Sequence, residues 1–369
     1  MAGVARGLVV VAVPGDKRAV ALGAAFEDSD REGPRGGRAI TWVSWAEALA
    51  DPACVGARGQ PGDWLRVDSP GADDATWHAL ARLGGFVREV PPGEWRPGRA
   101  WARGLATALS AIVGPATHLV PTHPHILAMT DKLACHQALD AGAVPVPGTF
   151  EAPATVATLR ERVVGERRHA VFVKPRWGSS GAGVLAWRRN GEREQVVTTA
   201  SLQADGRLLN DKHLHTYTDR VAIDRLLGTV IGDGAIVQRW IPKASADGGP
   251  FDLRVLVVDG RIAQRVARVG RGPITNLHLD SARADPDRVL ARFGRPAATR
   301  VHAACLAAAA CFPGHRAIGV DVMVDPGGRP FVLECNAWGD YLPGLRVDGL
   351  DSYGVQLRGL FAVDSAEAA

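Results

Sequence analysis

The segment FVKPRWGSSGAGV, residues 172–184, decides how the chain is interpreted. It begins as an apolar strand that ends at Lys174, and it continues as a glycine-rich turn that carries the hydroxyls of Ser179 and Ser180. Glycines let backbone N–H groups approach an anion closely, hydroxyls add donors, and a lysine supplies positive charge for phosphate oxygens. The lysine precedes the glycines and no Gly-Lys-Ser/Thr follows, so the segment is not a Walker A loop. It predicts a phosphate-binding hairpin, with an ordinary tight turn as an alternative of equal weight.

Two apolar segments far downstream carry oxygen side chains. Asp321 interrupts residues 319–323, and Glu334 and Asn336 belong to residues 333–336. Because side chains alternate along a strand, Glu334 and Asn336 share one face. If the two strands pair, the three oxygen side chains converge, and hard oxygen ligands in that number suit Mg²⁺. Solvated polar residues at strand ends are the alternative, which the apolar surroundings disfavour.

A third segment, residues 236–241, is apolar with a polar break in its middle. Such a strand can offer backbone groups to an adenine edge while Trp240 packs nearby, although a core strand is the commoner source of this pattern. Asp252 and Arg254 then begin a hairpin with both polar side chains on one face. Asp259-Gly260 is the expected turn of that hairpin.

The N-terminal third of the chain alternates short apolar runs with helical patterns. Residues 8–13 and 39–43 are expected to be buried strands, and residues 72–83 and 100–113 helices. This alternation is typical of a small parallel α/β domain. No GxGxxG follows the first strand, which disfavours a dinucleotide-binding dehydrogenase.

A helix and an extended linker follow this first domain. Thr130 or Asp131 can cap a helix that runs to about residue 141, and Gly142 can end it in the left-handed conformation. The VPVP sequence at residues 144–147 favours extended chain. Strands joined by hairpins follow from residue 171 onward. The sequence therefore predicts an α/β protein in three parts, at residues 1–120, 121–240 and 241–369.

Composition excludes several functional classes. Lys+Arg 43 against Asp+Glu 39 gives a net charge of +4, which is too mild to indicate a nucleic-acid partner. The five cysteines form no CxxC pair, so neither a disulfide framework nor a zinc site is expected. The longest apolar helical pattern, residues 303–312, is far shorter than the roughly 20 residues that span a bilayer. Residues 8–13 are also too short an apolar run for a signal peptide. These features favour a cytoplasmic protein with no membrane partner.

Taken in this order, the segments resemble the ATP-grasp superfamily, and in particular its RimK-type glutamate ligases and similar carboxylate–amine ligases. The resemblance covers about residues 120–345. It implies the ATP-grasp fold, in which an N-terminal parallel α/β domain is followed by two α+β lobes that sandwich ATP. The matching segments are residues 130–133, 144–147, 173–184, 237–241, 252–258, 275–278, 319–321 and 333–336.

The resemblance also implies how ATP would be held. Lys132 and Lys174 would bind its phosphates, beneath a loop that closes over them and contains Ser179, Ser180 and Gly181. The adenine would lie against the segment formed by Gln238, Arg239, Trp240 and Ile241. Further nucleotide contacts would come from Asp252, Thr275 and Asn276.

The catalytic and metal-binding roles follow from the same resemblance. Arg254 and Arg268 would neutralise charge on the transferred phosphoryl group and on an acyl phosphate. One or two Mg²⁺ ions, with Mn²⁺ as the alternative, would be held by Asp321, Glu334 and Asn336.

Several positions depart from the family pattern. Arg239 stands where an acid is common, and Ile274 stands where RimK-type proteins often carry a basic residue. Residues 337–344 read AWGDYLPG, where relatives continue with a small residue, Pro and Gly. Because this segment borders the acceptor site in relatives, we expect a substrate other than glutamate. Residues 196–225 look like an insertion, and we expect their His213, His215 and Tyr217 on a solvated surface rather than at the substrate.

The resemblance predicts an ATP- and Mg²⁺-dependent carboxylate–amine or carboxylate–thiol ligase that forms an acyl phosphate. Its substrate would be an amino acid, a peptide or a specialised metabolite. Phosphoryl transfer needs positioning and charge neutralisation more than a protein nucleophile, and the predicted site contains no obvious nucleophile. An ATP-grasp kinase and a non-catalytic nucleotide- or peptide-binding partner are the alternatives. The sequence leaves open whether the protein forms a homodimer.

Overall fold

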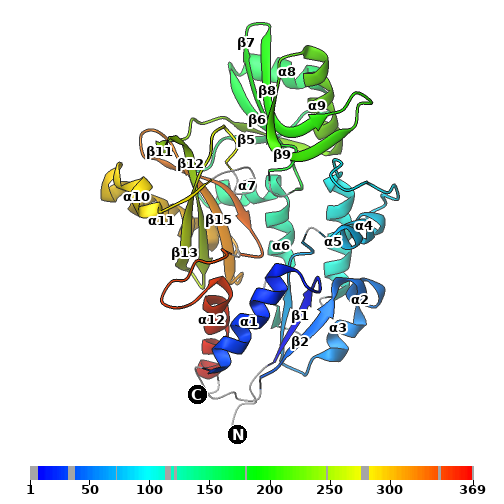
Figure 1. Cartoon of the computed structure of the whole chain (residues 1–369), viewed down its shortest axis with the longest axis vertical. Coiled ribbons are helices and arrows are strands. Elements are labelled where there is room, and N and C mark those ends of the chain that lie inside the picture. Colours follow the sequence, from blue (N-terminus) through cyan, green and yellow to red (C-terminus); the bar gives the residue numbers. More distant parts are fainter. Residues whose placement is uncertain are drawn as a thin grey trace.

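The chain folds around three β-sheets (Figure 1). In the computed structural model, the described residues are 7–31, 38–71, 73–112, 118–119, 123–178, 181–246, 248–275, 282–339 and 342–367. The first sheet lies at the bottom of Figure 1, the second at the top, and the third beside and between them. The predicted α/β architecture is confirmed.

The first sheet is parallel throughout, as predicted. Its strand order is β2 (Ile40–Ser44), β1 (Leu8–Ala12), β3 (Trp64–Val67) and β4 (His118–Leu119). Every residue of β1 is buried, because helices cover both faces of the sheet. These helices are α1 (Lys17–Arg31), α2 (Trp45–Ala50), α3 (Ala53–Arg58), α4 (Asp74–Leu83), α5 (Gly98–Ile112) and the C-terminal α12 (Ser352–Glu367). Helix α12 lies beside α1 (Figure 1), and Tyr353, Leu357 and Leu360 share a core with Leu22.

The second sheet is antiparallel and forms the small lobe. Its order is β5 (Thr149–Glu151), β10 (Ala235–Arg239), β6 (Ala170–Pro175), β7 (Leu185–Asn190), β8 (Arg193–Leu202) and β9 (Leu208–Tyr217). Helices α8 (Val156–Gly165) and α9 (Arg220–Asp233) share its core with Val171 and Val173. The alternation of β6 therefore turns Phe172 and Lys174 to the opposite face.

The expectation of an insertion at residues 196–225 is corrected by this sheet. Those residues supply most of β8, all of β9 and the start of α9, so they belong to the lobe's framework. The β8–β9 pairing shifts register between Thr198 and Ala200. Such an irregularity weakens the alternating pattern by which a strand is recognised in sequence.

The third sheet forms the large lobe. Its order is β14 (Ala282–Ala284), β13 (Arg261–Val269), β12 (Gly249–Val258), β15 (Ala317–Val324) and β16 (Pro330–Asn336), and β11 (Ser245–Ala246) pairs with β12. Helices α10 (Pro286–Ala291) and α11 (Gly294–Ala310) pack against it. The predicted Asp259-Gly260 turn joins β12 to β13, with φ values of 48° and 71° that suit a tight hairpin.

Helices α6 (His123–Thr130) and α7 (Lys132–Ala141) lie between the first domain and the lobes. The predicted cap is confirmed, because the Asp131 carboxylate accepts from the N–H groups of Leu133 and Ala134. The predicted left-handed Gly142 is wrong: its φ is −81°, and Ala143 has the positive φ of 54°. Glycine is needed there for space, since a Cβ at Gly142 would lie 2.5 Å from Cys311 Sγ.

None of the helices in the described part of the chain is both long and apolar enough to span a membrane. The division into residues 1–120, 121–240 and 241–369 stays a proposal, which the three sheets support. The packing of α12 on α1 adds the end of the chain to the first domain's core.

Candidate active site

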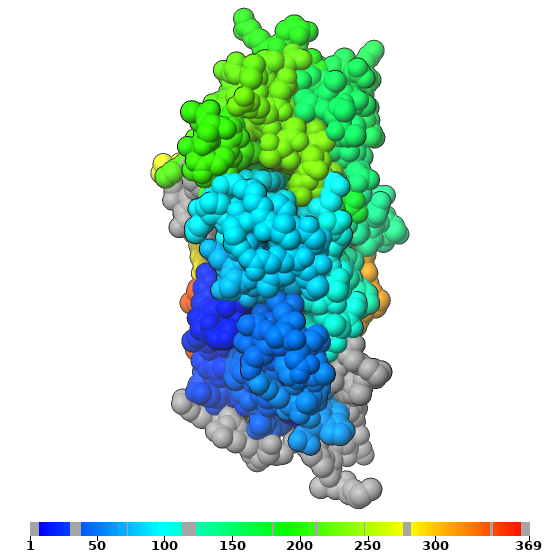
Figure 2. All heavy atoms as spheres, turned by 90° about the vertical axis from the view of Figure 1, so that its right-hand side faces the viewer, coloured from blue at the N-terminus to red at the C-terminus, as the bar shows by residue number. Residues whose placement is uncertain are grey.

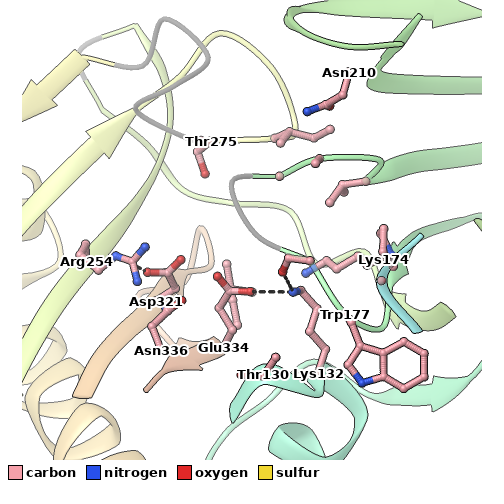
Figure 3. A pocket seen from close by; sticks show the side chains of 18 of the residues that line it. Thr130, Lys132, Lys174, Trp177, Asn210, Arg254, Thr275, Asp321, Glu334 and Asn336 are labelled. Atoms are coloured by element: carbon pink, nitrogen blue, oxygen red, sulfur yellow. Dashed lines mark hydrogen bonds and ion pairs between the residues drawn. The ribbon is translucent and has the colours of Figure 1, made fainter. Parts of the chain in front are cut away.

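One cleft of about 1390 Å³ brings the predicted site residues together (Figure 3). Its lining includes every predicted site residue that the structure describes, namely Lys132, Lys174, Gly181, Gln238, Arg239, Trp240, Ile241, Asp252, Arg254, Arg268, Thr275, Asp321, Glu334 and Asn336. Ser179, Ser180 and Asn276 lie outside the described residues. All three sheets contribute to the walls, since residues after β1 and β3 also line the cleft.

Lys174 projects from β6 into the cleft. Its Nζ donates to Gln238 Oε1 at 2.7 Å, so its nearest partner is a neutral amide on the neighbouring strand β10. Burial lowers the pKa of Lys174 to about 8, and the charge of Lys132 acts in the same direction. The cation is therefore partly desolvated and suited to a phosphate.

Lys132 stands at the first turn of α7, where the Asp131 cap fixes the start of the helix. Arg176 donates two hydrogen bonds of 2.7 Å to the Asp131 carboxylate. This bidentate pair links the start of the glycine-rich segment to helix α7. Lys132 Nζ donates to the Gly178 carbonyl at 2.5 Å and lies 3.7 Å from Glu334 Oε2. Figure 3 shows Lys132 between the loop and the acidic strands.

The acidic strands pair as the sequence predicts. Asp321 of β15 lies opposite Glu334 of β16, and Gly319 lies opposite Asn336. Cys335 points into the core, so the two oxygen side chains of β16 share the cleft face. Asn336 Nδ2 donates to the Gly319 carbonyl at 3.2 Å, which fixes the amide with its Oδ1 as the remaining acceptor.

Asp321 is paired with both predicted catalytic arginines. Its Oδ1 lies 2.9 Å from Arg254 Nε, and its Oδ2 lies 3.0 Å from Arg268 Nη2. Burial raises the pKa of Asp321 to about 6, although both arginines act in the opposite direction. Burial acts likewise on Glu334, but Lys132 and Arg254 prevail and lower its pKa to about 2.

A second buried network surrounds Asp252. Arg268 Nε donates to its Oδ1 at 2.6 Å, Lys243 Nζ donates to its Oδ2 at 3.0 Å, and the Thr275 hydroxyl also donates to Oδ2. Burial opposes ionisation, yet Arg268 and Lys243 hold the pKa of Asp252 below its usual range. Arg268 thus bridges Asp252 and Asp321. Burial alone would lower the pKa of Arg268, but the two carboxylates outweigh this effect and raise it.

Lys243 is a cleft residue that the sequence did not identify. It follows Pro242 directly after residues 236–241. Strand β10 ends at Arg239, and a proline cannot donate to a β-ladder, so Pro242 was the available signal that the next side chain lies outside the sheet.

The predicted adenine segment lies along β10 and just after it. The N–H of Arg239 donates to Gly148 O at 2.9 Å and that of Trp240 to Ala170 O at 3.4 Å. Within the described residues, the N–H of Ile241 donates to no other backbone group. The Trp240 ring packs against Phe172, with centroids 4.8 Å apart. An apolar surface and a backbone donor thus border the same part of the cleft.

His136 supports this segment from behind. Its Nε2 lies 2.9 Å from Leu333 O and 3.0 Å from the Gln238 amide nitrogen. Burial lowers the pKa of His136 to about 4, and the charge of Lys174 adds to this shift. The ring is therefore neutral near pH 7 and acts as a spacer between β10 and β16.

The cleft can accept a divalent cation and a polyphosphate. Two carboxylates and an amide oxygen on adjacent strands are the hard donors that Mg²⁺ prefers. The described residues hold no cluster of three His, Cys, Asp or Glu side chains arranged for a metal, so Asn336 completes the candidate set. Among the predicted site residues and Lys243, five cationic side chains outnumber three carboxylates: Lys132, Lys174, Lys243, Arg254 and Arg268 against Asp252, Asp321 and Glu334. The excess of positive charge suits a nucleotide.

The first domain closes the cleft on its lower side. Asp16, Lys17 and Arg18, where β1 leads into α1, line the cleft, and so do Ser69 and Trp77. Trp338 of the large lobe reaches this domain and donates from Nε1 to Val67 O at 3.1 Å. His213, His215 and Tyr217 are not among the residues that line the cleft. His213 is exposed, as expected. The expected solvated position is wrong for Tyr217, which packs against the small-lobe core and donates its hydroxyl to Ala200 O at 3.3 Å.

Solved structures share this fold across nearly the whole chain. The D-cycloserine synthetase DcsG is 16% identical, with 97% of this chain and 99% of that chain covered at a TM-score of 0.55. The ATP-grasp ligase PsnB, solved with a minimal precursor, is 15% identical, with 98% and 99% covered at a TM-score of 0.55. A D-alanine–D-alanine ligase from Bacillus anthracis is 13% identical, with 99% of both chains covered at a TM-score of 0.51. A comparison with proteins of curated function finds no match.

The family assignment comes from a family model. The model described as "YheC/D like ATP-grasp" matches residues 129–340, which is more than half of the chain and includes both lobes of the cleft. The predicted membership of the ATP-grasp superfamily is confirmed, and the chain belongs to the YheC/D-like ATP-grasp family.

Proposed function

We propose that the protein is an ATP- and Mg²⁺-dependent ligase that activates a carboxylate as an acyl phosphate and transfers the acyl group to an amine or a thiol. The observation that carries this proposal is the approach of two opposite walls of the cleft. Lys132 Nζ lies 3.7 Å from Glu334 Oε2, so phosphate-binding cations and oxygen ligands for a metal meet at one place.

The nucleotide would bind with its adenine against residues 239–241 and its phosphates toward Lys132 and Lys174. The apolar face of Trp240 and Phe172 supports the adenine position. The backbone N–H of Ile241 is the donor available to the adenine edge. The hydroxyl of Thr275 and the ammonium of Lys243, both bonded to Asp252, border the same space.

Mg²⁺ would be held by Asp321, Glu334 and Asn336, and it would supply charge neutralisation to the phosphates. The donor set fits because all three side chains end in oxygen and face the cleft from adjacent strands. The arginines that now pair with Asp321 would then be shared with the substrate and the phosphoryl group.

The reaction needs no protein nucleophile. A substrate carboxylate oxygen attacks the γ-phosphorus of ATP, the bond to the β-phosphate oxygen breaks, and ADP leaves. An amine or thiol then attacks the acyl carbon, inorganic phosphate leaves, and the nucleophile loses its proton. Arg254 and Arg268 are placed to offset negative charge in both steps, because they border Asp321 at the centre of the cleft.

The acceptor would enter from the first-domain side. ATP occupies only part of a cleft of about 1390 Å³, and Trp77 and Trp338 offer flat apolar surface in the remainder. A peptide or a specialised metabolite is therefore the substrate class that we propose. A structure of PsnB is described as complexed with a precursor peptide, which supports a peptide as the first substrate to test.

We further propose that the protein works in the cytoplasm, because five free cysteines suit a reducing compartment.

The test is ADP release from Mg²⁺-ATP with a pool of amino acids, small acids and peptides. We expect release that depends on an added acid and falls at least about a hundredfold in Glu334→Ala. The matched control is Glu161→Gln, an exposed acid on α8, which should behave as the native chain.

Mass spectrometry of the same mixture distinguishes the outcomes. An amide or thioester supports the ligase. A phosphate ester would instead identify a kinase. Mg²⁺-dependent ATP binding without turnover, even with a full range of acids and nucleophiles, would favour a non-catalytic binding protein.

A further inference from the structure

A segment of the first domain, Gly93–Arg99, reaches the small lobe and touches the glycine-rich loop. Asn210 N donates to Gly93 O at 2.8 Å, and Trp95 N donates to Leu208 O at 2.7 Å. An antiparallel bridge between Glu94 and Leu209 lies between these two bonds. The segment thus extends the edge of the small-lobe sheet at β9. Figure 2 shows the cyan first domain directly beneath the green small lobe on this face.

The Trp95 side chain packs against the C-terminal end of the loop, at Gly183. A Cβ added to Gly183 would overlap the edge of the Trp95 ring, so the ring packs directly on this glycine. Gly183 also has a φ of 64°, a left-handed conformation that glycine adopts without strain. Gly183 is therefore favoured for two independent reasons: a side chain would meet the Trp95 ring, and the backbone is in the left-handed conformation.

The same segment also contacts the N-terminal end of the loop, next to Gly178. A Cβ added to Gly98 would lie 2.5 Å from the carbonyl oxygen of Trp177, the residue that precedes Gly178. The Asp233 carboxylate secures this contact, because it accepts from Gly98 N at 2.5 Å and from Arg99 N at 3.2 Å. Residues of the first domain thus touch both described ends of the loop.

Two further bonds hold the described parts of the loop. The Thr199 hydroxyl lies 3.1 Å from the Gly181 carbonyl and 3.2 Å from Asn210 Oδ1. Asn210 is the residue whose N–H binds Gly93, so the two attachments are adjacent. At the other end, Gly178 accepts from Lys132, which we assign to the phosphates.

We propose that Trp95 is a positioning residue for Gly183, and that residues 93–99 form a clamp that fixes the two described ends of the glycine-rich loop, Trp177–Gly178 and Gly181–Gly183, beside the nucleotide site. Trp95 acts through Gly183 and touches no reacting atom in this proposal. Its consequence for catalysis rests on the nucleotide site proposed above, whereas its effect on the loop can be measured without nucleotide.

The first experiment is hydrogen exchange of peptides that cover Gly181–Leu185, in the nucleotide-free protein. Val184 N donates to Gly181 O at 3.3 Å, so its amide reports on the end of the loop. We expect Trp95→Ala to speed exchange about tenfold there, while β15 and β16 exchange as in the native chain. Trp95→Phe should restore most of the protection, because a flat ring remains.

The control is Trp42→Ala, which removes an exposed tryptophan of the first domain, on β2, that is not among the residues lining the cleft. It should leave exchange of the loop unchanged. Asp233→Asn weakens the clamp without altering Trp95, and it should speed exchange at Gly181–Leu185 less than Trp95→Ala does. Native-like exchange of the loop in both Trp95→Ala and Asp233→Asn would overturn the proposal, and so would an equal effect of Trp42→Ala.

A double-variant cycle tests the contact itself. Gly183→Ala should lower Mg²⁺-ATP affinity strongly in the native background, because its methyl group would meet the Trp95 ring. In Trp95→Ala the same change should cost at least about threefold less, and the remainder would reflect the positive φ. Equal losses in both backgrounds would overturn the proposed contact. Absence of Mg²⁺-ATP binding by the native chain would instead contradict the proposed function. The hydrogen-exchange measurement needs no nucleotide, so it would still test whether residues 93–99 position the loop.

Discussion

The two walls of the cleft hold their charges in opposite ways. On the small-lobe side, Lys174 binds a neutral amide, and Lys132 binds a backbone carbonyl with its nearest carboxylate 3.7 Å away. On the large-lobe side, Arg268 lies within 3.0 Å of both Asp252 and Asp321. The two lysines thus make at most one long ion pair among the described residues, that of Lys132 with Glu334, while Arg268 is neutralised by two close carboxylates.

This difference predicts how each wall responds to mutation. Changes on the large-lobe wall should affect stability as well as function, because they leave buried charges without a partner. Changes on the small-lobe wall should affect ligand binding while leaving the fold intact.

Arg268→Met should be the most damaging substitution to stability. Arg268 is 5% exposed, and its removal would leave two buried carboxylates with one cation fewer each. We expect a loss of about 3–5 kcal/mol in the free energy of unfolding, measured by urea denaturation. Arg254→Met is the matched comparison, because it pairs with Asp321 but is more exposed and should cost clearly less. Equal losses would contradict the distinction.

Lys174→Met should lower the affinity for Mg²⁺-ATP without lowering the free energy of unfolding. It removes a desolvated cation, so stability should not fall, and the affinity for Mg²⁺-ATP should drop by about ten- to a hundredfold. Titration calorimetry and thermal denaturation of the same preparation check both parts. A destabilised variant that still binds ATP normally would show that Lys174 is structural.

The pH dependence of binding should reveal the same lysine. The pKa of Lys174, about 8, lies below its ordinary value of 10.5, so the fold disfavours its charged form. The resulting loss of stability is present below pH 8 and disappears as the pH rises from about 8 to 10.5. ATP affinity should fall over the same interval, by at most about tenfold per pH unit for one proton. Lys174→Met should remove this slope, and a slope that persists would assign it to another group.

Trp338→Phe should have the smallest effect. It removes the bond from Nε1 to Val67 O that joins the large lobe to the first domain, and it keeps an aromatic ring in place. We expect a loss of about 1 kcal/mol in unfolding free energy and unchanged ATP affinity. A large loss of ATP affinity would mean that this contact also sets the geometry of the nucleotide site.

Sequence reasoning succeeded where a local pattern determines geometry. The period-two alternation of β16 placed Glu334 and Asn336 on one face, and pairing with β15 then brought Asp321 opposite Glu334. The glycine-rich segment was recognisable because its lysine and glycines are contiguous. The ATP-grasp architecture could be predicted from such segments because their order along the chain matched a known family.

Sequence reasoning failed where the geometry depends on distant packing. Gly142 has an ordinary φ, and a side chain there would meet Cys311 at the C-cap of α11, a contact that no local pattern indicates. Lys243 joins the cleft only because β12 and β13 present Asp252 and Arg268 to it. Likewise, Trp95 reaches Gly183 through pairing of the first domain with β9, which neither segment specifies alone.

The most direct test of the central claim is calorimetric titration of ATP into the native chain, with and without Mg²⁺, and into the double variant Lys132→Met/Lys174→Met. We expect one Mg²⁺-dependent site in the native chain, and loss of that site in a double variant that remains folded. A native chain that binds no ATP, or a folded double variant that binds it equally well, would contradict the assignment of this cleft to the nucleotide.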